Sequence, residues 1–334
     1  MRRLTHMAII SRLKSSAHAY SACTYSARTW THLGLLGMAA LWGASWPWGQ
    51  VVAQAMPPLA AASLRFILAS CVLLLWLTRT GRIRSLLALS PQQWLGMAIA
   101  SSVGVLGYSI FFMLALKTVP ASRATMVVAL NPVLTMIFAA LLFREAVNWM
   151  MVTGVILAVT GALTALTNGS LLALHPSQSS LGEIFLLGCA LCWVTYTLIG
   201  RRVLTSLDSL TTTTVTAVIG ALLLLLASLM LEGPQAWLDL VAAPAPAWVC
   251  LIALALGATA LAYAWYLNGV KVLGAGPAAA YISLVPLFGI LCSNLWLSQP
   301  LTVPLMSGGA LALIGMLMMN VGRNRLVSKA QGDE

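Results

Sequence analysis

Long apolar segments alternate with short polar loops along almost the whole chain. The apolar segments are about 20 residues long, enough for a helix to cross a hydrocarbon core of ~30 Å, and the loops hold nearly all of the charged side chains. A membrane β-barrel would instead show alternating positions in segments of about 10 residues. The pattern predicts an all-α membrane protein with ten transmembrane helices. The expected spans are residues 33–52, 59–77, 94–115, 122–143, 150–167, 183–199, 211–231, 248–269, 275–297 and 303–321.

The second half of the chain repeats the first at an interval of about 154 residues. Five positions recur at that interval: Trp94, Lys117, Pro132, Gly154 and Gly161 are matched by Trp248, Lys271, Pro286, Gly308 and Gly315. Paired halves in an apolar chain are typical of transporters that alternate access to a site between their repeats. The predicted organisation is a cytoplasmic extension (1–32), a first five-helix repeat (33–168), a linker (169–182), a second five-helix repeat (183–322) and a cytoplasmic tail (323–334).

Loops at matching positions of the two halves carry opposite charge. The loop after the second span contains Arg79, Arg82 and Arg84, whereas its counterpart contains Glu232 and Asp239 and no lysine or arginine. Lysine and arginine accumulate in cytoplasmic loops. The two repeats are therefore predicted to be inverted relative to each other, with both termini in the cytoplasm.

Composition agrees with this class and excludes several others. Hydrophobic residues make up 60% of the chain and charged residues 7%, far below the roughly 25% of a soluble domain. The net charge of +11 lies mostly in loops on the predicted inner side, so the expected partner is the lipid bilayer and not nucleic acid. Residues 1–32, rich in serine and arginine, are expected to form an irregular extension.

Neither the cysteines nor the histidines predict redox or metal chemistry. Cys189 and Cys192 form a C-x-x-C within a span, which we interpret as helix packing, and the four histidines all lie outside the spans. A membrane enzyme would need a nucleophile or metal constellation there. We expect no cofactor, no metal and no enzymatic activity.

Several short motifs resemble those of one family. They are Leu41-Trp42-Gly43, Leu64-Arg65-Phe66, the stretch from Ala115 to Ala121, Asn131-Pro132 and Phe143-Arg144-Glu145. Together they resemble the EamA-type transporters of the drug/metabolite transporter superfamily, over residues 33–322. Gln299 departs from the pattern, because the second repeat of that family often has glutamate there. The resemblance implies ten helices, secondary transport without a cofactor, and export of amino acids or other small metabolites across the bacterial inner membrane.

Arg65 and two prolines mark the candidate site. An arginine inside a span costs about 2.5–3.5 kcal/mol even on lenient scales, so Arg65 either binds an anionic group in a cavity or extends its stem to the interface. Pro132 and Pro286 interrupt equivalent spans at equivalent depth. Polar residues beside them are candidates for substrate binding, with helix–helix hydrogen bonding as the alternative. These residues are Asn131, Tyr281 and Ser283.

Aromatic residues inside the spans predict an apolar cavity wall for a small organic solute. They are Trp42, Trp46, Tyr108, Trp193, Tyr196, Tyr263 and Trp265, and we expect half of them to line the cavity. No carboxylate lies in the middle of a span, so proton coupling would have to use Glu145 or Glu183. The paired glycines of the fifth and tenth spans are assigned to the scaffold.

The function expected from the sequence is export of amino acids or related small metabolites by a secondary transporter with alternating access. A transporter of sugars or drug-like compounds and a passive facilitator channel stay open as alternatives, and so does a homodimer as the assembled form.

Overall fold

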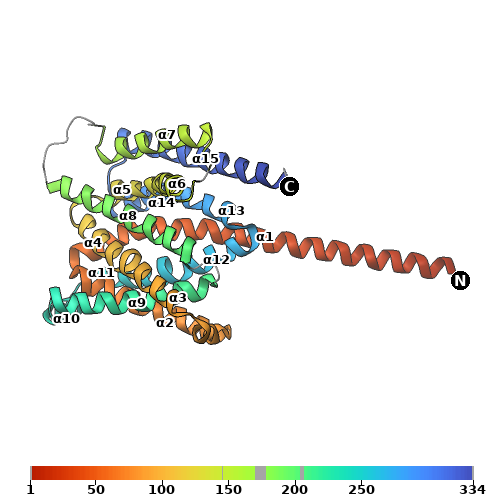
Figure 1. The fold of residues 1–334 in the computed structure, drawn as a ribbon, viewed down its shortest axis with the longest axis horizontal. Coiled ribbons are helices and arrows are strands. Elements are labelled where there is room, and N and C mark those ends of the chain that lie inside the picture. Colours follow the sequence, from red (N-terminus) through yellow and green to blue (C-terminus); the bar gives the residue numbers. More distant parts are fainter. Residues whose placement is uncertain (1, 145, 170–177, 204–206, 333–334) are drawn as a thin grey trace.

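The computed structural model describes residues 2–144, 146–169, 178–203 and 207–332, and within these ranges it contains helices and no strand. Figure 1 shows the helices side by side in one bundle. The α-helices are α1 (Arg2–Ala55), α2 (Pro58–Arg79), α3 (Pro91–Ser101), α4 (Tyr108–Thr118), α5 (Ala121–Ala124), α6 (Leu130–Phe143), α7 (Trp149–Leu166), α8 (Gln178–Val203), α9 (Ser209–Leu231), α10 (Gln235–Val241), α11 (Ala245–Ile252), α12 (Ala262–Leu273), α13 (Ala275–Ala280), α14 (Val285–Leu297) and α15 (Val303–Gly332).

Five further segments have tighter or wider helical turns. Three are 3₁₀-helices: η1 (Arg82–Ala88), η3 (Thr125–Ala129) and η5 (Tyr281–Leu284). Two are π-helices that join α-helices into one span: η2 (Ser102–Gly107) between α3 and α4, and η4 (Ala253–Leu261) between α11 and α12. π-Helical turns insert an extra residue and occur often at functional sites.

Nine continuous helical stretches of the described residues are long and apolar enough to cross a membrane. They coincide with nine of the ten predicted spans. The remaining predicted span, 33–52, lies inside α1, where three tryptophans, Pro47 and Gln50 make the segment less apolar. It is nevertheless packed in the bundle, since Leu35, Met38 and Ala39 are fully buried. The count of ten stays a prediction.

The N-terminal segment differs from expectation. We expected residues 1–32 to be irregular, but α1 begins at Arg2 and continues unbroken into the bundle, beyond which its N-terminal part projects (Figure 1). The physical reason is that residues 1–33 contain neither proline nor glycine, so no residue interrupts the helix.

The repeat seen in the sequence extends to irregular details of the backbone. Ala121 and Ala275 each begin a short α-helix, which passes through a 3₁₀-helix into a longer α-helix. Each long helix ends at a residue with left-handed backbone, Arg144 (φ 55°) and Ser298 (φ 53°). All of these positions are 154 residues apart in the two halves.

Matching helices of the two halves pack against each other in antiparallel pairs. In the α7–α15 pair, a Cβ atom at Gly154 would lie 2.7 Å from the Gly315 carbonyl oxygen, and one at Gly308 would lie 2.5 Å from the Gly161 carbonyl oxygen. Only glycine permits this approach, which supports the scaffold role predicted for these residues.

The α2–α9 pair is held at both of its ends. The Glu232 carboxylate, after α9, accepts hydrogen bonds from the backbone N–H groups of Leu59 (2.8 Å) and Ala60 (2.9 Å) at the start of α2. At the opposite end, Arg82 donates to Asp208 (2.7 Å), which also caps α9 through Thr211 N–H. The segments η1 and α10 therefore lie at opposite ends of this pair. We call the bundle end that holds α10 the α10 end, and the other end, where the C-terminus lies in Figure 1, the terminal end.

Candidate functional site

A cavity of about 120 Å³ lies between the two halves. One ordered water needs roughly 10–15 Å³, so there is room for about eight to twelve water-sized groups, which is about the size of one amino acid. The lining residues are Trp42, Ser45, Trp46, Arg65, Phe66, Gly104, Val105, Tyr108, Val128, Asn131, Trp193, Tyr196, Thr213, Thr216, Ala217, Ala258, Thr259, Tyr263, Ile282 and Val285. Both π-helices contribute to this wall.

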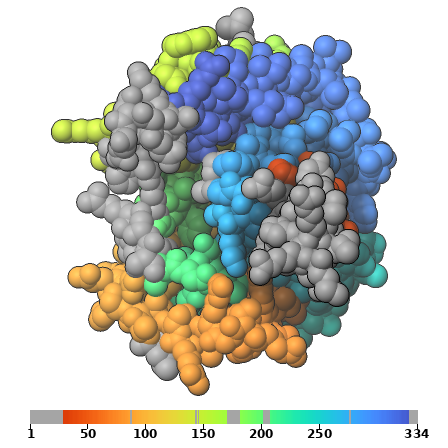
Figure 2. Space-filling model, turned by 90° about the vertical axis from the view of Figure 1, so that its right-hand side faces the viewer, coloured from red at the N-terminus to blue at the C-terminus, as the bar shows by residue number. Residues whose placement is uncertain are grey.

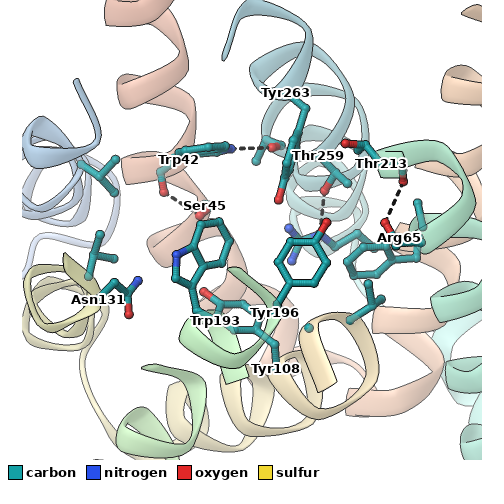
Figure 3. A pocket seen from close by; sticks show the side chains of 18 of the residues that line it. Trp42, Ser45, Arg65, Tyr108, Asn131, Trp193, Tyr196, Thr213, Thr259 and Tyr263 are labelled. Carbon is teal, nitrogen blue, oxygen red and sulfur yellow. Dashed lines mark hydrogen bonds between the residues drawn. The ribbon is translucent and has the colours of Figure 1, made fainter. Parts of the chain in front are cut away.

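An aromatic cluster forms much of the cavity wall, and its members come from α1, α4, α8 and α12. The Trp42 ring meets Tyr263 edge-on at a centroid separation of 5.4 Å and Trp193 at 6.3 Å. Tyr108 extends the cluster, at 6.2 Å from Trp193 and 5.9 Å from Phe112. Figure 3 shows these side chains turned toward a common space. Of the seven aromatic residues named from the sequence, only Trp265 does not line the cavity, so more than the expected half do.

Trp42 is fixed by a hydrogen bond between the two halves. Its indole Nε1–H donates to the carbonyl oxygen of Ala258 in η4 (3.0 Å), and Ser45 donates back to the Trp42 carbonyl (2.6 Å). The neighbouring Thr259 donates to the carbonyl of Leu254, five residues earlier (2.9 Å). The π-helix thus directs both a carbonyl and a hydroxyl toward α1 and α2.

Arg65 points into the cavity. Its Nε–H donates to the Thr259 hydroxyl (3.1 Å), and its Cζ lies 5.3 Å from the Phe66 ring centroid and 5.9 Å from that of Phe112. Its two terminal Nη groups make no hydrogen bond to the described residues, and the one salt bridge among those residues is Arg82–Asp208. The guanidinium therefore presents a free fork of donors in a setting of aromatic rings, the geometry that suits a carboxylate.

Asn131 lies on the cavity wall next to Pro132. Within the described residues its carboxamide makes no hydrogen bond, and its Oδ1 is buried. The prolines themselves do not line the cavity. Pro132 and Pro286 have no N–H to donate to the carbonyls of Val128 and Ile282, four residues back. These carbonyls accept instead from the nearer backbone N–H groups of Leu130 and Val285, and both Val128 and Ile282 line the cavity.

Two predicted site residues lie elsewhere. The Tyr281 hydroxyl is 2.6 Å from His32 Nδ1, and Ser283 is buried and accepts a hydrogen bond from Asn320 (3.2 Å). Both tie helices together, the alternative role weighed from the sequence. Glu183 lies in α8 outside the cavity, and Glu145 is outside the described residues.

Sequence reasoning missed the hydroxyl-bearing part of the wall, formed by Ser45, Thr213, Thr216 and Thr259. The run of threonines from 211 to 214, unusual at the start of an apolar span, was the available signal. No group of three or more His, Cys, Asp or Glu side chains in the described ranges could hold a metal ion.

The α10 end is closed beside the cavity by two glutamines. Gln50 accepts a hydrogen bond from Ala121 N–H (2.8 Å), and Gln299 accepts one from Ser122 N–H (2.9 Å). Gln299 Nε2 also donates to Gln50 Oε1 (2.7 Å). These bonds satisfy amide groups at the start of α5 that have no partner in the helix. An ionised glutamate at position 299 could not donate to Gln50, which gives the departure from the family pattern a physical reason. We call this pair the glutamine clasp.

The terminal end is more open. Figure 2 looks onto this end, where the surface is hollowed between the orange residues of α2 and α3 and the blue residues of α12 to α15. Residues of α8, in green, lie deeper in the hollow. Hydrogen-bonded helix ends thus lie at the α10 end of the bundle, and a hollow in the surface lies at the terminal end.

Residues 29–167 and 180–321 each match the sequence model described as the EamA-like transporter family. The two matches together cover most of the chain and coincide with the two halves. A solved crystal structure shares the fold, with a TM-score of 0.63 and 21% identity over 87% of this chain and 97% of the other.

Curated relatives are also similar over most of their length. An uncharacterized transporter of Bacillus subtilis, YyaM, is 28% identical over 287 residues, covering 86% of this chain and 92% of the relative. A probable amino-acid metabolite efflux pump of Salmonella typhimurium is 26% identical, covering 87% and 95%. A probable terminal-alkyne amino-acid exporter of Streptantibioticus cattleyicolor is 23% identical, covering 70% and 76%.

Proposed function

Because the chain belongs to the EamA-like transporter family, we propose that it exports amino acids or related small metabolites across the bacterial inner membrane by alternating access. The observation that carries this proposal is the cavity between the halves, in which a guanidinium without a carboxylate partner is surrounded by aromatic rings. The two relatives named for amino-acid export support the choice of cargo.

The packing of matching helices supports an inverted repeat of two five-helix units. The equivalent helices α7 and α15 lie antiparallel, and so do α2 and α9. Two units related by an axis in the membrane plane produce this relationship. Rocking of one unit against the other would then expose the cavity to each side of the membrane in turn.

The loop charges support one orientation of the protein in the membrane. The terminal end carries Arg82 and Arg84, whereas the α10 end carries Glu232 and Asp239. By the positive-inside rule, the terminal end and both chain termini face the cytoplasm. In this assignment the cavity loads from the cytoplasm while the glutamine clasp holds the outer side closed.

In the loaded state Arg65 binds the carboxylate of the substrate. An amino acid would thereby be held at its carboxylate while the aromatic cluster contacts its side chain.

The test is counterflow in proteoliposomes with a panel of amino acids, sugars and cationic drugs. Arg65→Ala should weaken the apparent affinity for the amino acid by about 1.5–3 kcal/mol, which is about 10- to 150-fold, because a hydrogen bond to a charged group is lost. Arg65→Lys should keep part of it, since lysine lacks the forked geometry. Arg84→Ala, at an exposed loop position, is the matched control and should behave like wild type.

Three outcomes would contradict the proposal. Wild-type affinity in Arg65→Ala would remove the carboxylate site. Counterflow of sugars or drugs alone would favour the alternative cargo. Flux of an amino acid without acceleration by substrate on the other side would indicate a passive channel.

A further inference from the structure

Arg65 and Asn131 both line the cavity, both have polar groups without a partner among the described residues, and the two side chains lie apart from each other. Arg65 belongs to α2 and Asn131 to α6, and in Figure 3 they lie on opposite sides of Trp193. The carboxylate and ammonium groups of an amino acid are attached to the same carbon atom. A ligand that binds Arg65 by its carboxylate would therefore reach Asn131 with its far end and not with the ammonium group.

The space between these two groups is aromatic. Trp42, Tyr108 and Trp193 form successive ring contacts there, at centroid separations of 6.2–6.3 Å. Ring contacts of this kind favour a flat, π-rich ligand segment, because offset and edge-to-face arrangements add stabilisation beyond the burial of area. The middle of the ligand is expected to be planar.

Asn131 indicates what the far end of the ligand must carry. Its carboxamide makes no hydrogen bond to the described residues although its Oδ1 is buried. Leaving a buried amide without a partner is unfavourable, and buried polar groups in native proteins nearly always have one. Since oxygen and nitrogen of an amide exchange places by a simple flip, Asn131 can accept from a ligand hydroxyl or donate to it.

We propose that the cavity selects a carboxylic acid with a flat aryl group that ends in a hydroxyl, of which tyrosine is the amino-acid member. Arg65 binds the carboxylate, the aryl ring packs against the cavity-facing surface of the aromatic cluster, and Asn131 pairs with the distal hydroxyl. This inference rests on the proposed function and specifies the cargo of the same site.

The experiment compares ligands that differ only at the far end. Tyrosine, phenylalanine and 4-methoxyphenylalanine are tested in counterflow and by quenching of tryptophan fluorescence, with Trp42, Trp46 and Trp193 as reporters on the cavity wall. Tyrosine should bind about 5- to 100-fold more tightly than phenylalanine, because phenylalanine would leave Asn131 without a partner. The methyl ether, which can accept a hydrogen bond but not donate one, should fall below tyrosine.

Variants assign the preference to one side chain. In Asn131→Leu the ratio of tyrosine to phenylalanine affinity should fall to about one, mainly through better binding of phenylalanine. Asn320→Leu removes a carboxamide that donates to Ser283 outside the cavity, so it should leave the ratio unchanged. The wild-type ligand series gives an answer even if a variant does not fold.

The outcomes separate this inference from the function it rests on. Equal affinity of the wild type for tyrosine and phenylalanine, or an unchanged ratio in a folded Asn131→Leu, overturns the hydroxyl site while amino-acid export stands. Absence of counterflow with every amino acid overturns both.

A ligand without the ammonium group tests the proposed arrangement directly. 3-(4-Hydroxyphenyl)propionate should compete with tyrosine, because it keeps the carboxylate for Arg65 and the hydroxyl for Asn131. Failure to compete would overturn this arrangement.

Discussion

Trp42 connects the two halves of the cavity through a single side chain. It contacts Tyr263 and Trp193 with its ring and donates a hydrogen bond to Ala258. A tryptophan whose N–H is satisfied in this way has a fixed orientation. The ring therefore presents the same face to any ligand.

The prediction is that Trp42→Phe lowers the free energy of unfolding by about 1–3 kcal/mol, through the lost hydrogen bond and the lost volume. Thermal unfolding in detergent, followed by fluorescence, measures it. Trp265→Phe is the control, because Trp265 packs against Gly34 and Gly37 and makes no hydrogen bond to the described residues. An equal loss in both variants would mean that the hydrogen bond contributes nothing.

Arg65 could be predicted from the sequence, whereas the threonines of the wall could not. A guanidinium in an apolar span is costly wherever it lies, so its position alone indicates a cavity or an interface. Threonine is tolerated in any span because its hydroxyl bonds to its own helix, as Thr216 does to the Thr212 carbonyl (2.9 Å). Only the fold distinguishes a threonine on the cavity wall from one facing a neighbour. The same ambiguity explains why Tyr281 and Ser283 were named as site residues and lie outside the cavity.

At the scale of elements, the spans were predictable and their internal irregularities were not. Nine spans follow from apolar length, and Pro132 and Pro286 lie just after the 3₁₀-helices η3 and η5. The π-helices η2 and η4 contain no proline and consist mostly of small and aliphatic residues. Such sequences are equally compatible with α-helix. Tertiary contacts, such as the hydrogen bond between Trp42 and Ala258, therefore determine whether the segment forms α-helical or π-helical turns.

Replacing either proline by alanine should slow transport without unfolding the protein. Alanine restores a donor for the carbonyl of Val128 or Ile282 and adds no bulk, which would straighten a helix beside the cavity. Counterflow rate, normalised to folded protein, should drop in Pro132→Ala and Pro286→Ala while the melting temperature stays within a few degrees. Pro244→Ala, at the N-cap of α11, serves for comparison. Unchanged rates in both variants would assign the prolines to structure alone.

For the whole molecule, the two ends of the α2–α9 pair should face opposite sides of the membrane. We expect a membrane-impermeant thiol reagent, added to intact cells, to label Asp239→Cys and not Arg84→Cys, both in a cysteine-free background. The two positions are exposed at opposite ends of the bundle, so accessibility to the reagent is not the limiting factor. Labelling of both would falsify the inverted arrangement. Reversed labelling would keep the inversion and reverse the direction of the protein in the membrane.

The glutamine clasp gives the closed α10 end a chemical property of its own. Carboxamides neither gain nor lose protons over the range in which cells live, so the three hydrogen bonds among Gln50, Gln299 and the start of α5 have the same strength in acidic and in alkaline surroundings. A closure of this kind does not respond to a proton gradient. The clasp therefore adds no pH dependence of its own to transport.

Gln299→Glu should make the closure of the α10 end depend on pH. A protonated glutamic acid can still donate a hydrogen bond to Gln50 Oε1. The ionised form cannot, so the bond between positions 299 and 50 is lost. Thiol labelling rises with pH in any protein because the thiolate is the reactive species. Labelling of a cysteine placed at Ser45, on the cavity wall, should therefore rise more steeply with pH in this variant than in the Gln299 parent. In the proposed orientation, the charge of this one side chain would decide whether the medium outside the cell can influence when the transporter opens to it.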